Sequence, residues 1–191
     1  MESILIVFCA MLVDNFLLTR LFGVESFFTA TEKPVGAALY GCLVTGVTVV
    51  SGTAIVSLYK FVLEPLNLRF LTTFASVIII TAITCAIQLI SSGMSKKVHM
   101  AIEGAVPMVS SNCIVLGSVL LCIEKAYSIE LSVIYLLSAG IGFTLAMLIF
   151  CCVQKRLSNT FMSESFRGIP ILLLSAALAG MAFSGFYGLS F

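Results

Sequence analysis

Two short clusters of polar residues lie within otherwise apolar stretches, and their side chains suit helix capping and ion binding. One cluster is Asp14-Asn15, and the other is Ser110-Ser111-Asn112-Cys113, which follows shortly after Pro107. Asn and Ser side chains can accept a hydrogen bond from an unpaired backbone N–H where a helix begins. A carboxylate inside a membrane costs roughly 2.5–3.5 kcal/mol on insertion scales, and it usually faces a cation, water or a partner. The candidates for an ion path are therefore Asp14, Asn15, Ser111 and Asn112.

Long apolar stretches surround both clusters and predict the elements that position them. The sequence is 60% hydrophobic and only 10% charged, with a mean hydropathy of +1.18, which is too little charge for the surface of a soluble domain. Helices of about 20 apolar residues cross the hydrocarbon core of a bilayer. Asp, Glu, Lys and Arg are all absent from residues 34–59, 70–95, 104–123, 131–154 and 168–191, and residues 3–22 form a sixth apolar stretch. We therefore predict an all-α integral membrane protein of six transmembrane helices, with a single transmembrane domain over residues 1–191.

The basic residues between these stretches predict the orientation in the membrane. One side would carry seven of them, Arg20, Lys33, Lys96, Lys97, Lys155, Arg156 and Arg167. The other side would carry three, Lys60, Arg69 and Lys125. Short cytoplasmic loops carry the excess of Lys and Arg, so we expect both termini outside. The net charge of +1 argues against nucleic acid as a partner.

Polar landmarks recur at one offset along the chain. Asn15 and Asn112 are 97 positions apart, and Arg69 and Arg167 are 98 apart. With three spans per half, the second half must enter the membrane upside down, as in many transport proteins. We therefore predict two inverted three-helix repeats, approximately residues 1–95 and 96–191, with spans one and four broken into half-helices. Two alternatives stay open: the polar side chains hydrogen-bond between unbroken helices, or Asp14 is protonated and satisfied by a carbonyl.

Three segments carry a resemblance to a known family: Val13-Asp14-Asn15-Phe16-Leu17-Leu18 with Leu21-Phe22-Gly23, the stretch from Pro107 to Gly117, and Phe166-Arg167-Gly168. They resemble the paired membrane subunits shared by the Rnf electron-transport complex and the sodium-pumping NADH:quinone oxidoreductase. The resemblance implies a bacterial inner-membrane protein that assembles with a homologous subunit of inverted orientation, the E type in Rnf complexes, and with further subunits. It also implies a part in coupling electron transfer, of the ferredoxin-to-NAD type in Rnf, to translocation of Na⁺ or H⁺. Such a subunit is not catalytic alone.

The resemblance further implies an intramembrane [2Fe-2S] cluster, to which each of the two paired subunits supplies two cysteines. Cys113 stands at the position of one family ligand, but Glu25 stands where the family has the other cysteine. Iron–sulfur clusters are held by soft thiolates, and a carboxylate is a harder ligand. Three outcomes are open: Glu25 ligates iron, another residue replaces it, or the cluster is lost.

Asp14 is a second departure, because the family commonly has Asn at this position. Asp14 and Glu25 together place two carboxylates near the first span. Hard oxygen ligands suit Na⁺ or a proton better than iron. We therefore hypothesise a cation site that involves Asp14.

These observations favour a membrane electron-transfer subunit of an ion-translocating oxidoreductase. The alternative is a non-redox secondary transporter or ion-conducting subunit of the same fold that has lost the cluster, since inverted repeats with broken helices fit it equally well. A purely structural role in assembly is a third hypothesis. The six cysteines other than Cys113 are expected to be small apolar fillers of membrane helices.

Overall fold

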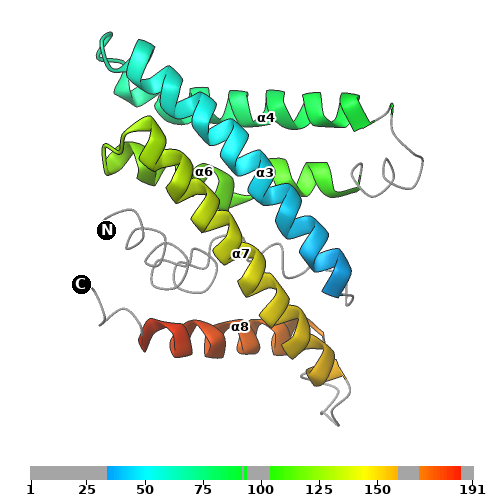
Figure 1. Cartoon of the computed structure of the whole chain (residues 1–191). Helices are drawn as coiled ribbons and strands as arrows, with labels where there is room; N and C mark the ends of the chain where they lie inside the picture. The colour runs from blue at the N-terminus through cyan, green and yellow to red at the C-terminus, as the bar shows by residue number, and fades with distance from the viewer. Residues whose placement is uncertain (1–33, 92, 94–103, 159–167, 186–191) are drawn as a thin grey trace. The chain divides into compact units, whose positions relative to one another are not determined.

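The computed structural model describes residues 34–91, 93, 104–158 and 168–185, and no strand occurs among them (Figure 1). Residues 104–110 are helical and lie directly before a short interruption. The remaining described elements are five α-helices and two short helical segments, of which η2 is π-helical and η3 is a 3₁₀-helix. In chain order they are α3 Pro34–Leu58, η2 Tyr59–Leu63, η3 Arg69–Leu71, α4 Thr72–Ser91, α6 Cys113–Glu124, α7 Ile129–Ser158 and α8 Ile169–Ser184.

Four helical segments of the described chain are long and apolar enough to cross a membrane. They are Pro34–Leu63, Arg69–Ser91, Gly104–Glu124 and Ile129–Leu157, and α8 is a shorter apolar helix. The predicted all-helical, multi-pass membrane architecture is therefore confirmed, and these segments coincide with the predicted spans. The first predicted span lies outside the described residues. Six spans, inverted repeats and the side of the termini stay predictions.

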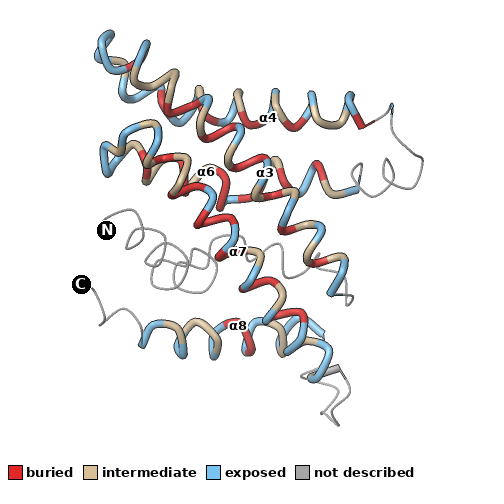
Figure 2. Tube along the Cα trace, in the orientation of Figure 1, coloured by how far each residue is buried: buried red, intermediate tan, exposed pale blue. Residues whose placement is uncertain are grey.

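The described residues fall into two compact units. One unit contains residues 43–137, and the other contains the described residues 34–42, 138–158 and 168–185. These boundaries differ from those of the predicted repeats, residues 1–95 and 96–191. Buried positions recur along α3 with helical spacing, at Ala37, Gly41, Val44, Thr48, Ser51, Gly52 and Ile55 (Figure 2). This periodicity gives α3 one continuous packing face.

In the unit that holds residues 34–42, 138–158 and 168–185, α3 approaches α7 closely at a glycine. A Cβ atom added to Gly41 would lie 2.6 Å from Thr144 Cγ2. The rings of Tyr40 and Phe143 also meet, with their centroids 6.4 Å apart. Small residues let the backbones of membrane helices approach, and van der Waals contact then drives their association.

In the unit of residues 43–137, a second glycine lets α3 pack against α6 and α7. A Cβ atom added to Gly52 would lie 2.5 Å from Leu136 Cδ1 and 3.1 Å from Val119 Cγ2. Leu136 and Val119 are fully buried. α4 contacts α6 and has a narrow buried stripe of mostly small residues, Thr72, Ser76, Ile80 and Thr84. The remaining surface of α4 is apolar and exposed, as expected of a helix that faces lipid.

Candidate functional site

The fourth predicted span is interrupted close to the predicted place. Residues 104–110 are helical, Ser111 lies in a turn, and α6 begins at Cys113. Between them Asn112 has an extended conformation, with φ −70° and ψ 117°. Two adjacent helical segments therefore meet at Ser111 and Asn112 within one apolar span.

Asn112 caps the second segment, as its residue type predicts. Its Oδ1 accepts a hydrogen bond from the Ile114 N–H at 3.1 Å, and its side chain is only 2% exposed. The backbone N–H of Asn112 donates to the Val109 carbonyl at 3.2 Å, which closes the first segment. An interruption within a membrane must satisfy its own polar groups, and this one does so through local bonds.

The two serines of the cluster hydrogen-bond to the last turn of the first segment. The Ser110 hydroxyl donates to the Pro107 carbonyl at 2.8 Å, and the Ser111 hydroxyl donates to the same carbonyl at 3.2 Å. The helix continues through Pro107 and ends only at Ser111. Pro107 therefore does not end the helix, and the interruption lies further along, where polar side chains compete for backbone hydrogen bonds.

Cys113 is the first residue of α6, and its side chain is exposed. The positive end of the helix dipole favours an anionic group at this position. Ser111 is also exposed, so a thiol and a hydroxyl lie at the surface of the interruption while Asn112 is buried beneath them. The structure therefore brings together three of the predicted site residues, Ser111, Asn112 and Cys113.

The other predicted site residues, Asp14, Asn15 and Glu25, lie outside the described residues. Within the described ranges, no group of three or more His, Cys, Asp or Glu side chains could hold a metal ion. An iron–sulfur cluster requires four ligands. The described residues therefore do not form a complete cluster site by themselves, and Cys113 could supply one thiolate to it.

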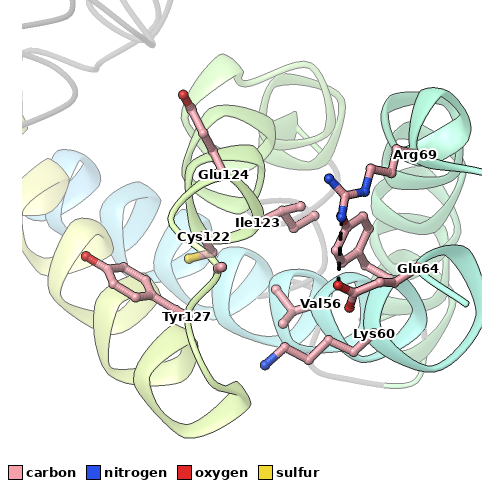
Figure 3. Close-up of a pocket in the computed structure, with 10 residues that line it drawn as sticks. Val56, Lys60, Glu64, Arg69, Cys122, Ile123, Glu124 and Tyr127 are labelled. Atoms are coloured by element: carbon pink, nitrogen blue, oxygen red, sulfur yellow. Dashed lines mark ion pairs between the residues drawn. The ribbon is translucent and has the colours of Figure 1, made fainter. Parts of the chain in front are cut away.

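Sequence reasoning missed a second feature, a cavity of about 360 Å³ at one end of the unit of residues 43–137 (Figure 3). Its charged and aromatic lining comprises Tyr59, Lys60, Glu64, Arg69, Glu124 and Tyr127. The basic residues Lys60, Arg69 and Lys125 were predicted to share one side of the membrane. Lys60 and Arg69 line the cavity, and Lys125 lies between its lining residues Glu124 and Ala126 in the sequence. The side of the membrane on which they lie stays a prediction.

Two helix ends of the same type shape this cavity. After η2, the Leu68 N–H donates to the Leu63 carbonyl at 3.0 Å, and Asn67 has a φ of 55°. After α6, the Tyr127 N–H donates to the Cys122 carbonyl at 3.2 Å, and Ala126 has a φ of 50°. Both patterns are Schellman motifs, which turn the chain sharply at a left-handed residue. Short loops therefore hold the charged residues at the ends of the helices.

The charged side chains in and beside the cavity form an ion pair and cation–π contacts. Arg69 and Glu64 form a long ion pair of 3.9 Å, with side chains that are 71% and 50% exposed. The Lys125 ammonium lies 5.9 Å from the centroid of the Tyr127 ring and 5.6 Å from that of Tyr135. Such cation–π contacts stabilise a lysine beside aromatic rings. The loop between α6 and α7 is therefore anchored by its own cation.

Comparisons with known proteins show which family the sequence resembles. The sequence matches the family described as "Rnf-Nqr subunit, membrane protein" over residues 3–190. It is 34% identical to the A-type subunit of the ion-translocating oxidoreductase complex of Syntrophotalea carbinolica, over 97% of this chain and 96% of the relative. It is 31% identical to the A-type subunit of the Na(+)-translocating ferredoxin:NAD(+) oxidoreductase complex of Acetobacterium woodii, over 99% of this chain and 98% of the relative. It is 32% identical to the A-type subunit of the ion-translocating oxidoreductase complex of Rhodobacter capsulatus, over 98% of this chain and 97% of the relative.

Proposed function

The chain belongs to the Rnf-Nqr family of membrane subunits, and on this premise we propose that it is the A-type subunit of an ion-translocating oxidoreductase complex. Such a complex couples electron transfer to the translocation of Na⁺ or H⁺. The names of the relatives support this function, because each is named as the A-type subunit of a translocating oxidoreductase complex. The apolar spans of the chain support a role within the membrane.

The proposal includes the full topology and the assembly. Six spans form two inverted halves with both termini outside, in the bacterial cytoplasmic membrane. A homologous subunit of opposite orientation, the E type, lies beside this chain, together with the other subunits of the complex. The apolar spans and the excess of basic residues on one predicted side support this arrangement.

We further propose that Cys113 is one ligand of a [2Fe-2S] cluster shared with the partner subunit. The observation that carries this proposal is the interruption capped by Asn112, which leaves an exposed thiol at the start of α6. Asn112 fixes the first turn of α6, and the helix dipole stabilises negative charge beside it. When bound, such a cluster accepts and passes on an electron. The remaining ligands would come from Glu25 or a substitute and from the partner subunit.

The test uses the purified complex with Cys113→Ser and, as a matched control, Cys85→Ser. Cys85 is also exposed but lies within the continuous helix α4. We expect Cys113→Ser to abolish the electron paramagnetic resonance signal of the cluster, lower the iron content and stop electron-driven ion transport, while Cys85→Ser retains all three. A complex that keeps its iron and its signal with Cys113→Ser contradicts the proposal. Ion transport in a complex without this iron would indicate the non-redox alternative.

Two further substitutions test the acidic residues near the first span. If Glu25 occupies a ligand position, Glu25→Cys should retain the iron and shift the reduction potential of the cluster, because a thiolate is softer than a carboxylate. If Asp14 belongs to a cation site, Asp14→Asn should slow ion transport and leave the iron content unchanged. Unchanged transport with Asp14→Asn would remove Asp14 from the ion path.

A further inference from the structure

The cavity at one end of the unit of residues 43–137 has the position and the chemistry of a site for a lipid headgroup. It lies where the segments Pro34–Leu63 and Gly104–Glu124 end and where α4 begins. These are the ends of apolar spans, the level at which phospholipid headgroups lie. Its volume of about 360 Å³ falls within the range of small-ligand pockets.

Two cations of the cavity retain capacity for a phosphate group. Lys60 forms no ion pair with any of the described carboxylates. The Lys60 side chain is half-buried along the cavity wall (Figure 3). Arg69 has only the long contact with Glu64, and its side chain is 71% exposed. A guanidinium presents five N–H donors, so one long ion pair leaves most of them available. Lys60 and Arg69 together can therefore bind phosphate oxygens.

The residues that follow these cations in the sequence are large, apolar and exposed. Phe61 follows Lys60 and is 74% exposed, and Phe70 follows Arg69 and is 75% exposed. Phe74, one turn further along α4, is also 75% exposed. Tyr59 and Tyr127 line the cavity, and tyrosine is enriched at the membrane–water interface. The cavity thus combines two cations, for a phosphate, and two carboxylates, Glu64 and Glu124, for a headgroup ammonium, with a neighbouring apolar surface for acyl chains.

We propose that this cavity binds a phospholipid, with its phosphodiester held by Lys60 and Arg69 and its acyl chains along Phe61, Phe70 and Phe74. The exposed phenylalanines favour a lipid over free phosphate, which has no acyl chain. The location at the ends of the spans favours it over a water-soluble ligand. The site is separate from the interruption at Asn112 and would exist whether or not Cys113 binds a cluster.

The test is a binding titration on the intact, delipidated complex in detergent. Phosphatidylethanolamine with a fluorescent acyl chain is the probe, and anisotropy measures its binding. We expect Lys60→Gln and Arg69→Gln each to weaken binding roughly fivefold and the double variant roughly thirtyfold, since the net loss of one hydrogen bond to a phosphate oxygen corresponds to about that factor. Lys60→Arg should retain binding. Lys155→Gln, a basic residue outside the cavity, is the matched control and should have no effect.

Two arms distinguish the phospholipid from other occupants. Inorganic phosphate at tens of millimolar should leave most of the probe bound, because it cannot replace the acyl-chain contacts. Complete displacement of the probe would assign the site to free phosphate and overturn the proposal. The subunit composition of the complex is measured for every variant. Loss of one subunit with probe binding unchanged would assign the cavity to a partner protein, and unchanged binding in both single variants would also overturn the proposal. The single variants give this readout even where the double variant fails to assemble.

Discussion

Replacing Asn112 by Ala tests the cap on which the candidate site rests. The substitution removes the oxygen that accepts the Ile114 N–H at 3.1 Å. Loss of an N-cap side chain costs about 0.5–2 kcal/mol, and a buried donor without a partner costs about 1–3 kcal/mol. These two ranges describe the same lost bond and do not add. Asn112 is 2% and Ile114 1% exposed, so water cannot replace the oxygen, and we expect about 2 kcal/mol.

The assay is reversible unfolding of the full chain in mixed detergent and SDS micelles, followed by circular dichroism. The matched control is Ser118→Ala on the same helix. Ser118 is equally buried, but its hydroxyl donates to the Val115 carbonyl within the helix, at 3.2 Å, and caps nothing. We expect this control to change the free energy of unfolding by less than about 0.5 kcal/mol, because the carbonyl keeps its place in the helix ladder.

A conservative variant separates the cap from the shape of the side chain. Asn112→Ser keeps a neutral acceptor oxygen of a preferred N-cap type, so it should recover much of the stability that Asn112→Ala loses. The reasoning is refuted if Asn112→Ala destabilises the chain no more than Ser118→Ala does. It is also refuted if Asn112→Ser is as unstable as the alanine variant.

The remaining predictions concern packing and backbone strain, and the same unfolding assay checks them. Gly41→Ala should destabilise the chain by about 1–3 kcal/mol, since the new Cβ would meet the stiff β-branched Thr144 at 2.6 Å. Gly46→Ala on the same helix should be neutral or stabilising by up to about 1 kcal/mol, because nothing lies within 4 Å. Thr144→Ala should relieve the clash of Gly41→Ala, and no coupling in the double variant would contradict that contact. Ala126→Gly should stabilise the chain by about 0.5–1 kcal/mol, since Ala126 has a φ of 50°; a loss of stability would show that its conformation carries no strain.

The spans could be predicted from charge alone, but their ends could not. The stretch without charges ends at residue 59, yet the helical segment continues through Lys60 to Leu63. α7 likewise extends beyond residues 131–154 and includes Glu130 and Lys155. Long basic side chains can extend from a helix to the membrane surface. A charged residue therefore marks the edge of the hydrocarbon core, while the helix continues until a turn motif ends it.

The interruption could be predicted because the residue types at Ser111 and Asn112 are rare within an apolar span. The proline nearby does not mark it, since the helix passes through Pro107 before it ends. The cavity could not be predicted, because its lining comes from residues 56–69 and 122–127, two stretches far apart in the sequence. Counting basic residues grouped Lys60, Arg69 and Lys125 on one side, but it gave no contact between them.

The direction of a hydrogen bond separates Asn112 from the other buried polar residues in the spans. The hydroxyls of Thr48, Ser76 and Thr84 each donate to a carbonyl four residues earlier in their own helix. Such bonds satisfy the hydroxyl and leave the helix continuous. Asn112 instead accepts from a backbone N–H, which is available only where a helix starts. Polar residues in a membrane span are thus weak evidence for a functional site by themselves. A side chain that caps a new helix within the span is strong evidence, because a continuous helix has no unpaired backbone N–H for it to accept.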